Sequence, residues 1–351
     1  WKTQILEDFP NGNYVEGYVS LVPEGEGVTL GLPYLGFYAD WEQAPLFDDV
    51  PDGDYYISPT RLVGASTDYI GGNYLGMGFG GTYDYSKLAF SADYNGEGNR
   101  ALALIPGLRR NATSLNLSVL DPAGSVMWES SYDRVPKNYF NTNSGGITLL
   151  AVWEGWDGCL TDGTYAPEGP GYIYRLTGSV GQSQAKQTMD IPFFLDNTAP
   201  KATDFTLMEE DGRYLLEFLV QDNHYVNYIQ LGDSTSQERL AAVGDGFGEI
   251  TEPGALTRVS IDITNYGDLC AKKGLNPARI TVYTTDYAGN TSMNYVEIGP
   301  RSMTLENLSL DVGATEQIAY TIRPDKLSSI PLTWTSSNES VATVDEGGRV
   351  T

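Results

Sequence analysis

Four aspartates close together in one short segment are the residues whose types and spacing come nearest to a chemical site. Asp48, Asp49, Asp52 and Asp54 lie within seven positions around Gly53. Hard cations such as calcium bind clustered carboxylate and carbonyl oxygens supplied by a loop, so these four aspartates are a candidate calcium-binding loop. The spacing is not that of an EF-hand, and no glutamate stands where that loop places its bidentate ligand. A solvated acidic loop that binds no metal is the interpretation that we favour over a metal site.

The residue types that enzymes use do not combine into a catalytic set in this sequence. A serine protease needs a base for its nucleophile, nearly always histidine; the one histidine, His224, follows a predicted strand, where we expect a structural hydrogen bond. Gly64–Asp68 superficially resembles a subtilisin nucleophile segment, but it lacks the helical continuation, so we interpret it as a loop. Acids beside tryptophan at Ala39–Trp41 and Trp153–Gly158 could flank a sugar, yet 46 acidic residues make such proximity expected by chance. We predict no catalytic residue and no cofactor other than calcium in this stretch.

The charge balance and the few cysteines limit the partners of the chain. Its 351 residues carry 46 Asp and Glu against 21 Lys and Arg, a net charge of −25 that repels phosphate backbones and anionic membranes. We therefore predict no nucleic-acid partner and, because no run of about 18 apolar residues occurs, no membrane insertion. Cys159 and Cys270 lie far apart, so we expect buried thiols and no disulfide framework.

The elements that must carry these residues are short antiparallel strands. Apolar residues alternate with polar ones in runs bounded by Gly, Asn, Asp or Pro, as half-buried strands require. These runs are Leu115–Val119, Tyr214–Val220, Val259–Ile263 and Ile318–Ile322. One short helix is expected at Tyr266–Lys273, ending at a glycine. The absence of alternating strands and helices excludes a subtilisin or Rossmann core, so we predict an all-β chain of tandem Ig-like or fibronectin type III-like antiparallel β-sandwich modules.

Turn-rich segments divide the chain into modules. They occur at Tyr94–Asn99, Phe193–Pro200 and Ile298–Ser302. We predict four modules, at residues 1–93, 94–199, 200–299 and 300–351, the first incomplete at its N-terminus and the last truncated. Because the chain opens and stops in the middle of a pattern, we interpret it as a piece of a longer protein. The linkers are short, so we expect limited bending between modules.

Several longer motifs resemble the accessory region of one enzyme family. Tyr14–Leu21 with Leu32–Trp41 resembles the first fibronectin type III-like module of lactocepin-type and complement-cleaving streptococcal peptidases, which are cell-envelope subtilisin-type serine peptidases. Leu88–Met127 and Asp162–Leu176 are similar to the second module of that family. The similarity departs at Ala92 and Glu97, which puts any cation site there in doubt.

Three further motifs follow: the first is similar to the module exit of that peptidase family, and the other two are similar to parts of bacterial Ig-like domains, one of them carrying the signature of the group 2 family. These motifs are the module exit Leu195–Pro200, the D-x-A-G-N hairpin in Ile280–Ser292, and the group 2 signature in Leu332–Thr351.

The resemblance implies a role without catalysis in this stretch. In that family such modules stand between the catalytic domain and the wall anchor of a secreted protein on the cell wall. The implied partners are an upstream catalytic domain of the same chain and protein substrates held at an exosite. An adhesin or carbohydrate-binding surface protein is the alternative function, in which exposed Trp41, Trp153 or Trp156 would stack on sugars. A stalk of another surface enzyme is a third.

Overall fold

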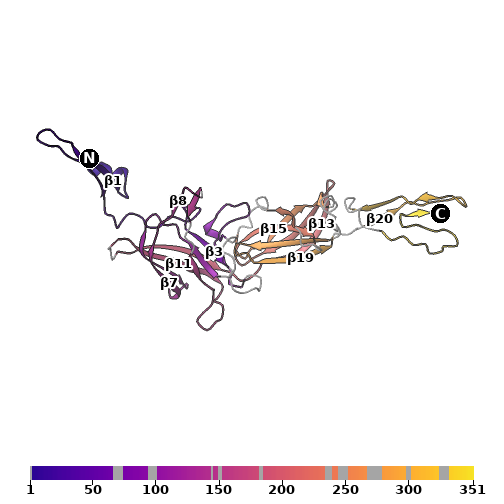
Figure 1. The fold of residues 1–351 in the computed structure, drawn as a ribbon. Coiled ribbons are helices and arrows are strands. Elements are labelled where there is room, and N and C mark those ends of the chain that lie inside the picture. The colour runs from indigo at the N-terminus through magenta and orange to yellow at the C-terminus, as the bar shows by residue number, and fades with distance from the viewer. Residues whose placement is uncertain are drawn as a thin grey trace. The chain divides into compact units, whose positions relative to one another are not determined.

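The structure is a computed structural model, and almost all of its regular elements are strands (Figure 1). It describes residues 2–65, 74–93, 101–143, 145–148, 152–181, 185–233, 239–243, 252–266, 279–297, 302–323 and 332–351. The chain forms two compact units. The first comprises Trp1–Gly76, Tyr83–Asp93 and Gly98–Leu195. The second comprises Met77–Thr82, Tyr94–Glu97 and Asp196–Thr351. None of the helices in the described part of the chain is long and apolar enough to cross a membrane.

The first unit is built around a five-stranded sheet and a three-stranded sheet. The larger sheet has the order β4 (Ala89–Phe90), β12 (Gln187–Leu195), β11 (Gly169–Ser179), β6 (Ala112–Leu120) and β7 (Val126–Val135). The smaller sheet has the order β10 (Val152–Trp156), β5 (Ala101–Ile105) and β3 (Arg61–Ala65). All pairs are antiparallel except β4 with β12.

One hydrophobic core joins the two sheets of the first unit. Tyr172, Tyr174 and Leu176 alternate along β11 and are buried, as period-two patterning requires. The same core contains Leu46 and Phe90, which precede residue 93, so both sides of the predicted boundary at 93–94 contribute to it. The division into four modules remains a prediction.

The first unit also contains smaller elements. The N-terminal segment forms α1 (Lys2–Asp8) and the hairpin β1 (Asn13–Leu21) with β2 (Leu30–Tyr38), and η1 (Tyr85–Lys87) is a single 3-10 turn. The hairpin β8 (Tyr139–Asn141) with β9 (Gly146–Thr148) follows the larger sheet's β7 in sequence.

The second unit contains a β-sandwich. Its three-stranded sheet has the order β13 (Lys201–Glu210), β14 (Arg213–Gln221) and β17 (Thr257–Asp262). Its four-stranded sheet has the order β16 (Arg239–Val243), β15 (Val226–Asp233), β18 (Arg279–Asp286) and β19 (Thr291–Glu297). Inward residues of both sheets, including Leu216 and Phe218 of β14 and Ile280 and Val282 of β18, share one core.

Two short strand pairs follow the sandwich. They are β20 (Ser302–Leu305) with β22 (Tyr320–Arg323), and β21 (Glu316–Gln317) with β23 (Arg349–Val350).

The predicted all-β class is confirmed, and a strand occupies or overlaps each of the four alternating runs. Strand β12 ends at Leu195, inside the turn-rich segment predicted to separate modules. Most of the predicted helix at Tyr266–Lys273, and Cys270 within it, lies outside the described residues, as do residues 66–68 of the Gly64–Asp68 segment.

Candidate metal centre

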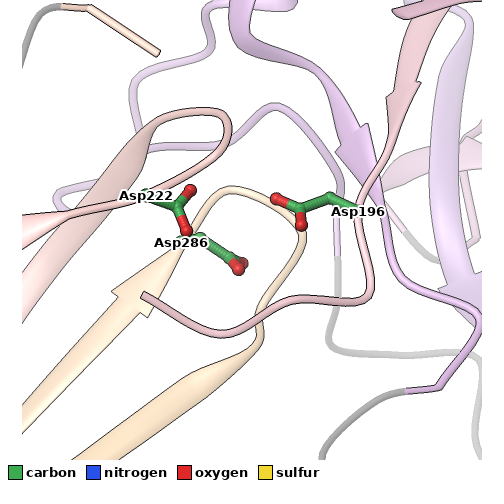
Figure 2. A group of neighbouring side chains, drawn as sticks. All are labelled: Asp196, Asp222 and Asp286. Carbon is green, nitrogen blue, oxygen red and sulfur yellow. The ribbon is translucent and has the colours of Figure 1, made fainter. Parts of the chain in front are cut away.

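Three aspartates of the second unit meet where three strands end. Asp196 directly follows β12, Asp222 directly follows β14, and Asp286 is the last residue of β18. One carboxylate oxygen of each lies within 4.8 Å of the others, and this is the one such group of potential metal ligands among the described residues (Figure 2). The side chains are 0%, 6% and 1% exposed, respectively. Strand ends bring together residues that are far apart in sequence, which is why the group is invisible as a local motif.

Asn290 ties the group together through its amide. Its Nδ2 donates to Oδ2 of Asp286 (2.8 Å) and to the carbonyl of Asp196 (2.9 Å), and its backbone N–H donates to Oδ1 of Asp286 (2.8 Å). Gly289, at φ +91°, closes the turn between β18 and β19 that brings Asn290 back to Asp286. Asn290 is 2% exposed, yet its Oδ1 is a buried acceptor without a hydrogen-bond partner.

The electrostatics of the group favour a bound cation. Burial, and then the neighbouring Asp196 and Asp222 carboxylates, raise the pKa of Asp286 well above its ordinary value, and the hydrogen bonds from Asn290 only partly oppose this. Clustered buried carboxylates are stable when they are protonated or when they coordinate a metal. The unsatisfied Oδ1 of Asn290 is a further oxygen donor in the same cluster, and exchange of its amide O and N would bring oxygen to the Asp286 side.

The donor set selects the class of ion. All of the candidate ligands are carboxylate oxygens and an amide oxygen, which suit hard cations and not zinc or copper. Calcium binds oxygen at about 2.3–2.6 Å, so ligands on opposite sides of the ion lie about 4.8 Å apart. The spacing of the three carboxylates fits that sphere. These residues therefore fit a hard cation such as calcium.

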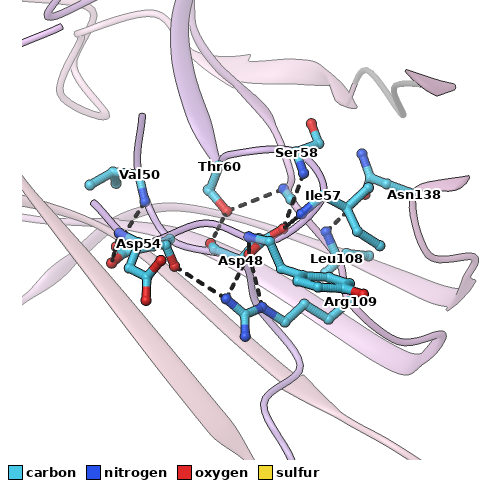
Figure 3. Close-up of polar contacts among 12 residues, drawn as sticks. Asp48, Val50, Asp54, Ile57, Ser58, Thr60, Leu108, Arg109 and Asn138 are labelled. Carbon is cyan, nitrogen blue, oxygen red and sulfur yellow. Dashed lines mark hydrogen bonds and ion pairs between the residues drawn. The ribbon is translucent and has the colours of Figure 1, made fainter. Parts of the chain in front are cut away.

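The four aspartates of the candidate calcium loop have other contacts. Asp48 is buried and accepts hydrogen bonds from the backbone N–H groups of Tyr56 (2.6 Å), Ile57 (2.7 Å) and Ser58 (3.1 Å), as well as a 2.8 Å ion pair from Arg109 (Figure 3). Burial acts to raise the pKa of Asp48, but these hydrogen bonds and Arg109 outweigh it and the pKa is lowered. Asp48 is thus held as a carboxylate by the protein itself.

The carboxylates of Asp49 and Asp52 also accept hydrogen bonds from backbone N–H groups. Asp49 accepts from the N–H groups of Val50 and Asp54, and Asp52 accepts from that of Tyr85. The structure does not bring three carboxylates of this loop together as it does at the three strand ends. These contacts give the loop a structural role, and calcium binding by Asp48, Asp49, Asp52 and Asp54 remains a hypothesis.

Other candidate residues are placed in structural surroundings. His224 is 8% exposed in the turn between β14 and β15, its backbone N–H donates to Oδ2 of Asp222 (3.1 Å), and its ring meets Tyr225 edge to face. Trp156 is 1% exposed in the core of the first unit and donates to the Cys159 carbonyl. Trp41 lies on the surface, and the side chain of Trp153 lies outside the described residues.

Sequence reasoning noted the Leu195–Pro200 and Ile280–Ser292 motifs but missed their shared chemistry. The available signal was an aspartate at the end of each strand with an asparagine one or four positions later: Asp196–Asn197, Asp222–Asn223 and Asp286 with Asn290. Such Asp and Asn pairs also mark ordinary turns, so only the fold distinguishes the two cases.

The described part of the chain is thus built mainly of antiparallel sheets, two of which form a β-sandwich with the oxygen-lined centre at its strand ends. Residues 299–351 match the bacterial Ig-like domain (group 2). Over 93% of its length the chain is 24% identical to the PI-type proteinase of Lactococcus lactis subsp. cremoris, and equally so to the PII-type proteinase of Lacticaseibacillus paracasei. It spans 17% of the length of each relative. The chain thus corresponds to a region of these proteinases, which confirms the resemblance drawn from its motifs.

The similarity of the chain to solved structures is low. The exo-chitosanase CsxA of Amycolatopsis orientalis aligns with 58% of this chain and 26% of its own at 13% identity, with a TM-score of 0.20. That score is too low to indicate a shared fold.

Proposed function

We propose that this chain is a non-catalytic spacer and bracing region of a secreted, cell-wall-associated, subtilisin-like serine endopeptidase. The observation that carries the proposal is the extent of the similarity. It runs along 93% of this chain while covering 17% of the proteinase, so a continuous β-rich region corresponds to a minor part of a much longer enzyme. An upstream catalytic domain of the same polypeptide is the expected partner, and the cell surface is the expected location.

Calcium has a structural role in this proposal. An ion held by Asp196, Asp222 and Asp286 joins the ends of strands from both sheets of the sandwich. Extracellular calcium is millimolar, and extracellular modules bind it with dissociation constants of about 10⁻⁴–10⁻³ M. The site is therefore occupied outside the cell, where the region works, and the bound ion holds the strand ends of the sandwich together.

The placement of particular side chains supports this function over the alternatives. His224 is packed against Tyr225 and shielded from solvent, so it is poorly placed to act as a base on a substrate. Trp156 fills a core and cannot stack on a sugar without unfolding the first unit. This removes one of the three tryptophans on which a carbohydrate-binding function would depend.

The test uses the gene and the whole enzyme. The coding sequence upstream of Trp1 should encode a subtilisin-type Asp, His and Ser catalytic domain. Deleting residues 1–351 from the parent should leave hydrolysis of a short fluorogenic peptide largely intact but shorten the half-life of the enzyme at elevated temperature. Substituting the upstream catalytic serine by alanine in the full-length parent is the control and should abolish all hydrolysis. An upstream sequence without that catalytic domain, or hydrolysis that survives the serine substitution, would contradict the proposal.

A further inference from the structure

A pocket in the first unit concentrates positive charge in a strongly acidic protein. Its volume is about 530 Å³, and its four charged lining residues are all cations: Arg109, Arg110, Arg134 and Lys137. The chain has more than twice as many acidic residues as basic ones, 46 against 21. A pocket lined by four cations and no acid is therefore not what composition alone produces. It is an arrangement that attracts anions locally against the net charge of the protein.

Three of the four cations have no carboxylate partner among the described residues. Arg109 is held by Asp48, so its charge is already compensated. Arg110, Arg134 and Lys137 form no ion pair with a residue in the described part of the chain. Arg134 also has φ +54°, an uncommon backbone conformation for a residue other than glycine, which marks a position under local constraint.

The guanidinium of Arg110 has two nitrogens on one edge that match the two oxygens of a carboxylate. Its Nη1 donates to the Ala44 carbonyl (2.7 Å), and its guanidinium carbon lies 4.2 Å from the centre of the Trp41 ring. Its Nε and Nη2 are buried donors without a hydrogen-bond partner. Elsewhere in the same unit, Arg175 uses these same two nitrogens to bind both oxygens of Asp190 at 2.6 Å each. A ligand carboxylate would satisfy Arg110 in the same two-pronged way.

The rest of the pocket wall selects the kind of anion. Tyr14 and Trp41 form an aromatic side, and aliphatic residues including Val135 and Val180 complete the wall. A phosphate polymer has nothing to place against such a wall, whereas a peptide offers apolar side chains beside its carboxylates. Trp41 is 43% exposed, so part of its indole is open to an apolar side chain of the ligand.

We infer that this pocket binds an acidic peptide segment, with carboxylates on Arg110, Arg134 and Lys137 and an apolar side chain against Tyr14 and Trp41. That the segment belongs to a protein substrate rests on the proposed function; the binding itself does not. The pocket is then an exosite that holds acidic stretches of a substrate away from the catalytic domain.

Binding is tested by calorimetric titration of the full 351-residue chain with a short peptide of alternating Glu and Phe residues, in parallel with its Gln counterpart. The Glu peptide should bind and the Gln peptide should not, and the affinity should fall as salt is raised. The double variant R134Q/K137Q should weaken binding about three- to tenfold, because each exposed ion pair contributes modestly. R110Q should weaken it at least about tenfold, because it removes hydrogen bonds from a charged donor.

Matched controls separate this pocket from general charge effects. K201Q removes an exposed cation of the second unit and should leave the affinity unchanged. Because R110Q also removes the contact to Ala44, the exposed pair Arg134 and Lys137 supplies the variant that leaves the fold intact. Equal binding of the Gln peptide, unchanged binding by R134Q/K137Q, or tighter binding of inorganic polyphosphate than of the Glu peptide would overturn the inference. None of these outcomes bears on whether a catalytic domain lies upstream.

Discussion

Replacing Asp286 by asparagine should stabilise the second unit without calcium and should remove most of the stabilisation that calcium gives the wild type. Without calcium, three buried carboxylates lie within 4.8 Å of one another. Unit charges at that separation repel by about 3.5 kcal/mol at an effective dielectric constant of about 20. A carboxyl can avoid this repulsion by binding a proton. At neutral pH, protonating a carboxyl of ordinary pKa costs about 4 kcal/mol, which is therefore the upper limit of the destabilisation. Asp286→Asn removes the third charge, so it should stabilise the calcium-free unit by about 2–4 kcal/mol.

Calcium should shrink the stability advantage of the variant. At about 10 mM calcium and a dissociation constant of about 10⁻⁴–10⁻³ M, the wild type should gain about 1.4–2.7 kcal/mol from binding. That gain should raise its Tm by about 3–10 °C. The Asp286→Asn variant has lost a charged ligand and should gain little. Differential scanning calorimetry in EDTA and in calcium measures both effects.

The pH dependence supplies an internal check on the same residue. The folded-state pKa of Asp286 is raised by burial and by its two acidic neighbours, above its unfolded value of about 3.9. In EDTA, the wild type should therefore gain stability as the pH falls from neutral through the raised pKa, and the gain should be complete below the unfolded pKa. Asp286→Asn should lack this gain. Equal destabilisation by Asp286→Asn in EDTA and in calcium would refute the reasoning, because Asp286 would then act only as a hydrogen-bond acceptor.

Three further predictions concern the first unit. Asp48→Asn leaves Arg109 without its partner and should destabilise the unit by about 3 kcal/mol in urea unfolding. Because the pKa of Asp48 is lowered in the folded state, the stability that Asp48 contributes is present above its unfolded pKa and is lost as the pH falls through its folded pKa. An Asp48→Asn variant that does not show this loss on acidification supports the assignment. Gly107→Ala would place a Cβ 2.2 Å from the Ser58 carbonyl and should cost more than about 2 kcal/mol, whereas Gly25→Ala, with nothing within 4 Å, should change the unfolding midpoint little. Trp156→Ala should cost about 3–5 kcal/mol by calorimetry, and a fully stable variant would contradict its place in the core.

The all-β class followed from the sequence because period-two alternation is a local signal. Tyr214–Val220 alternates over a full strand and became β14, since each inward side chain meets the core of the sandwich. Alternation does not reveal which strands share a core. Leu46 and Phe90 precede the Tyr94–Asn99 segment, yet they pack with residues that follow it, because sheet pairing across that segment is a long-range event.

The candidate metal centre could not be predicted for the same reason. Asp48, Asp49, Asp52 and Asp54 are dense in sequence, but backbone amides and Arg109 can neutralise such a cluster as well as a metal can. The three strand-end aspartates are spread over about ninety residues. Only the pairing of β14 and β18 with their neighbours, and the turn that ends at Asn290, brings them together.

The most direct measurement is the number of calcium ions bound per chain, determined by equilibrium dialysis with the wild type and two sets of variants. The wild type should bind one ion at millimolar calcium through the strand-end aspartates, and D196N/D222N/D286N should lose it. D49N/D52N/D54N, which leaves Asp48 and its ion pair intact, should retain that ion. Wild type that binds no calcium, or a triple strand-end variant that binds as the wild type does, would contradict the claim that calcium locks this brace.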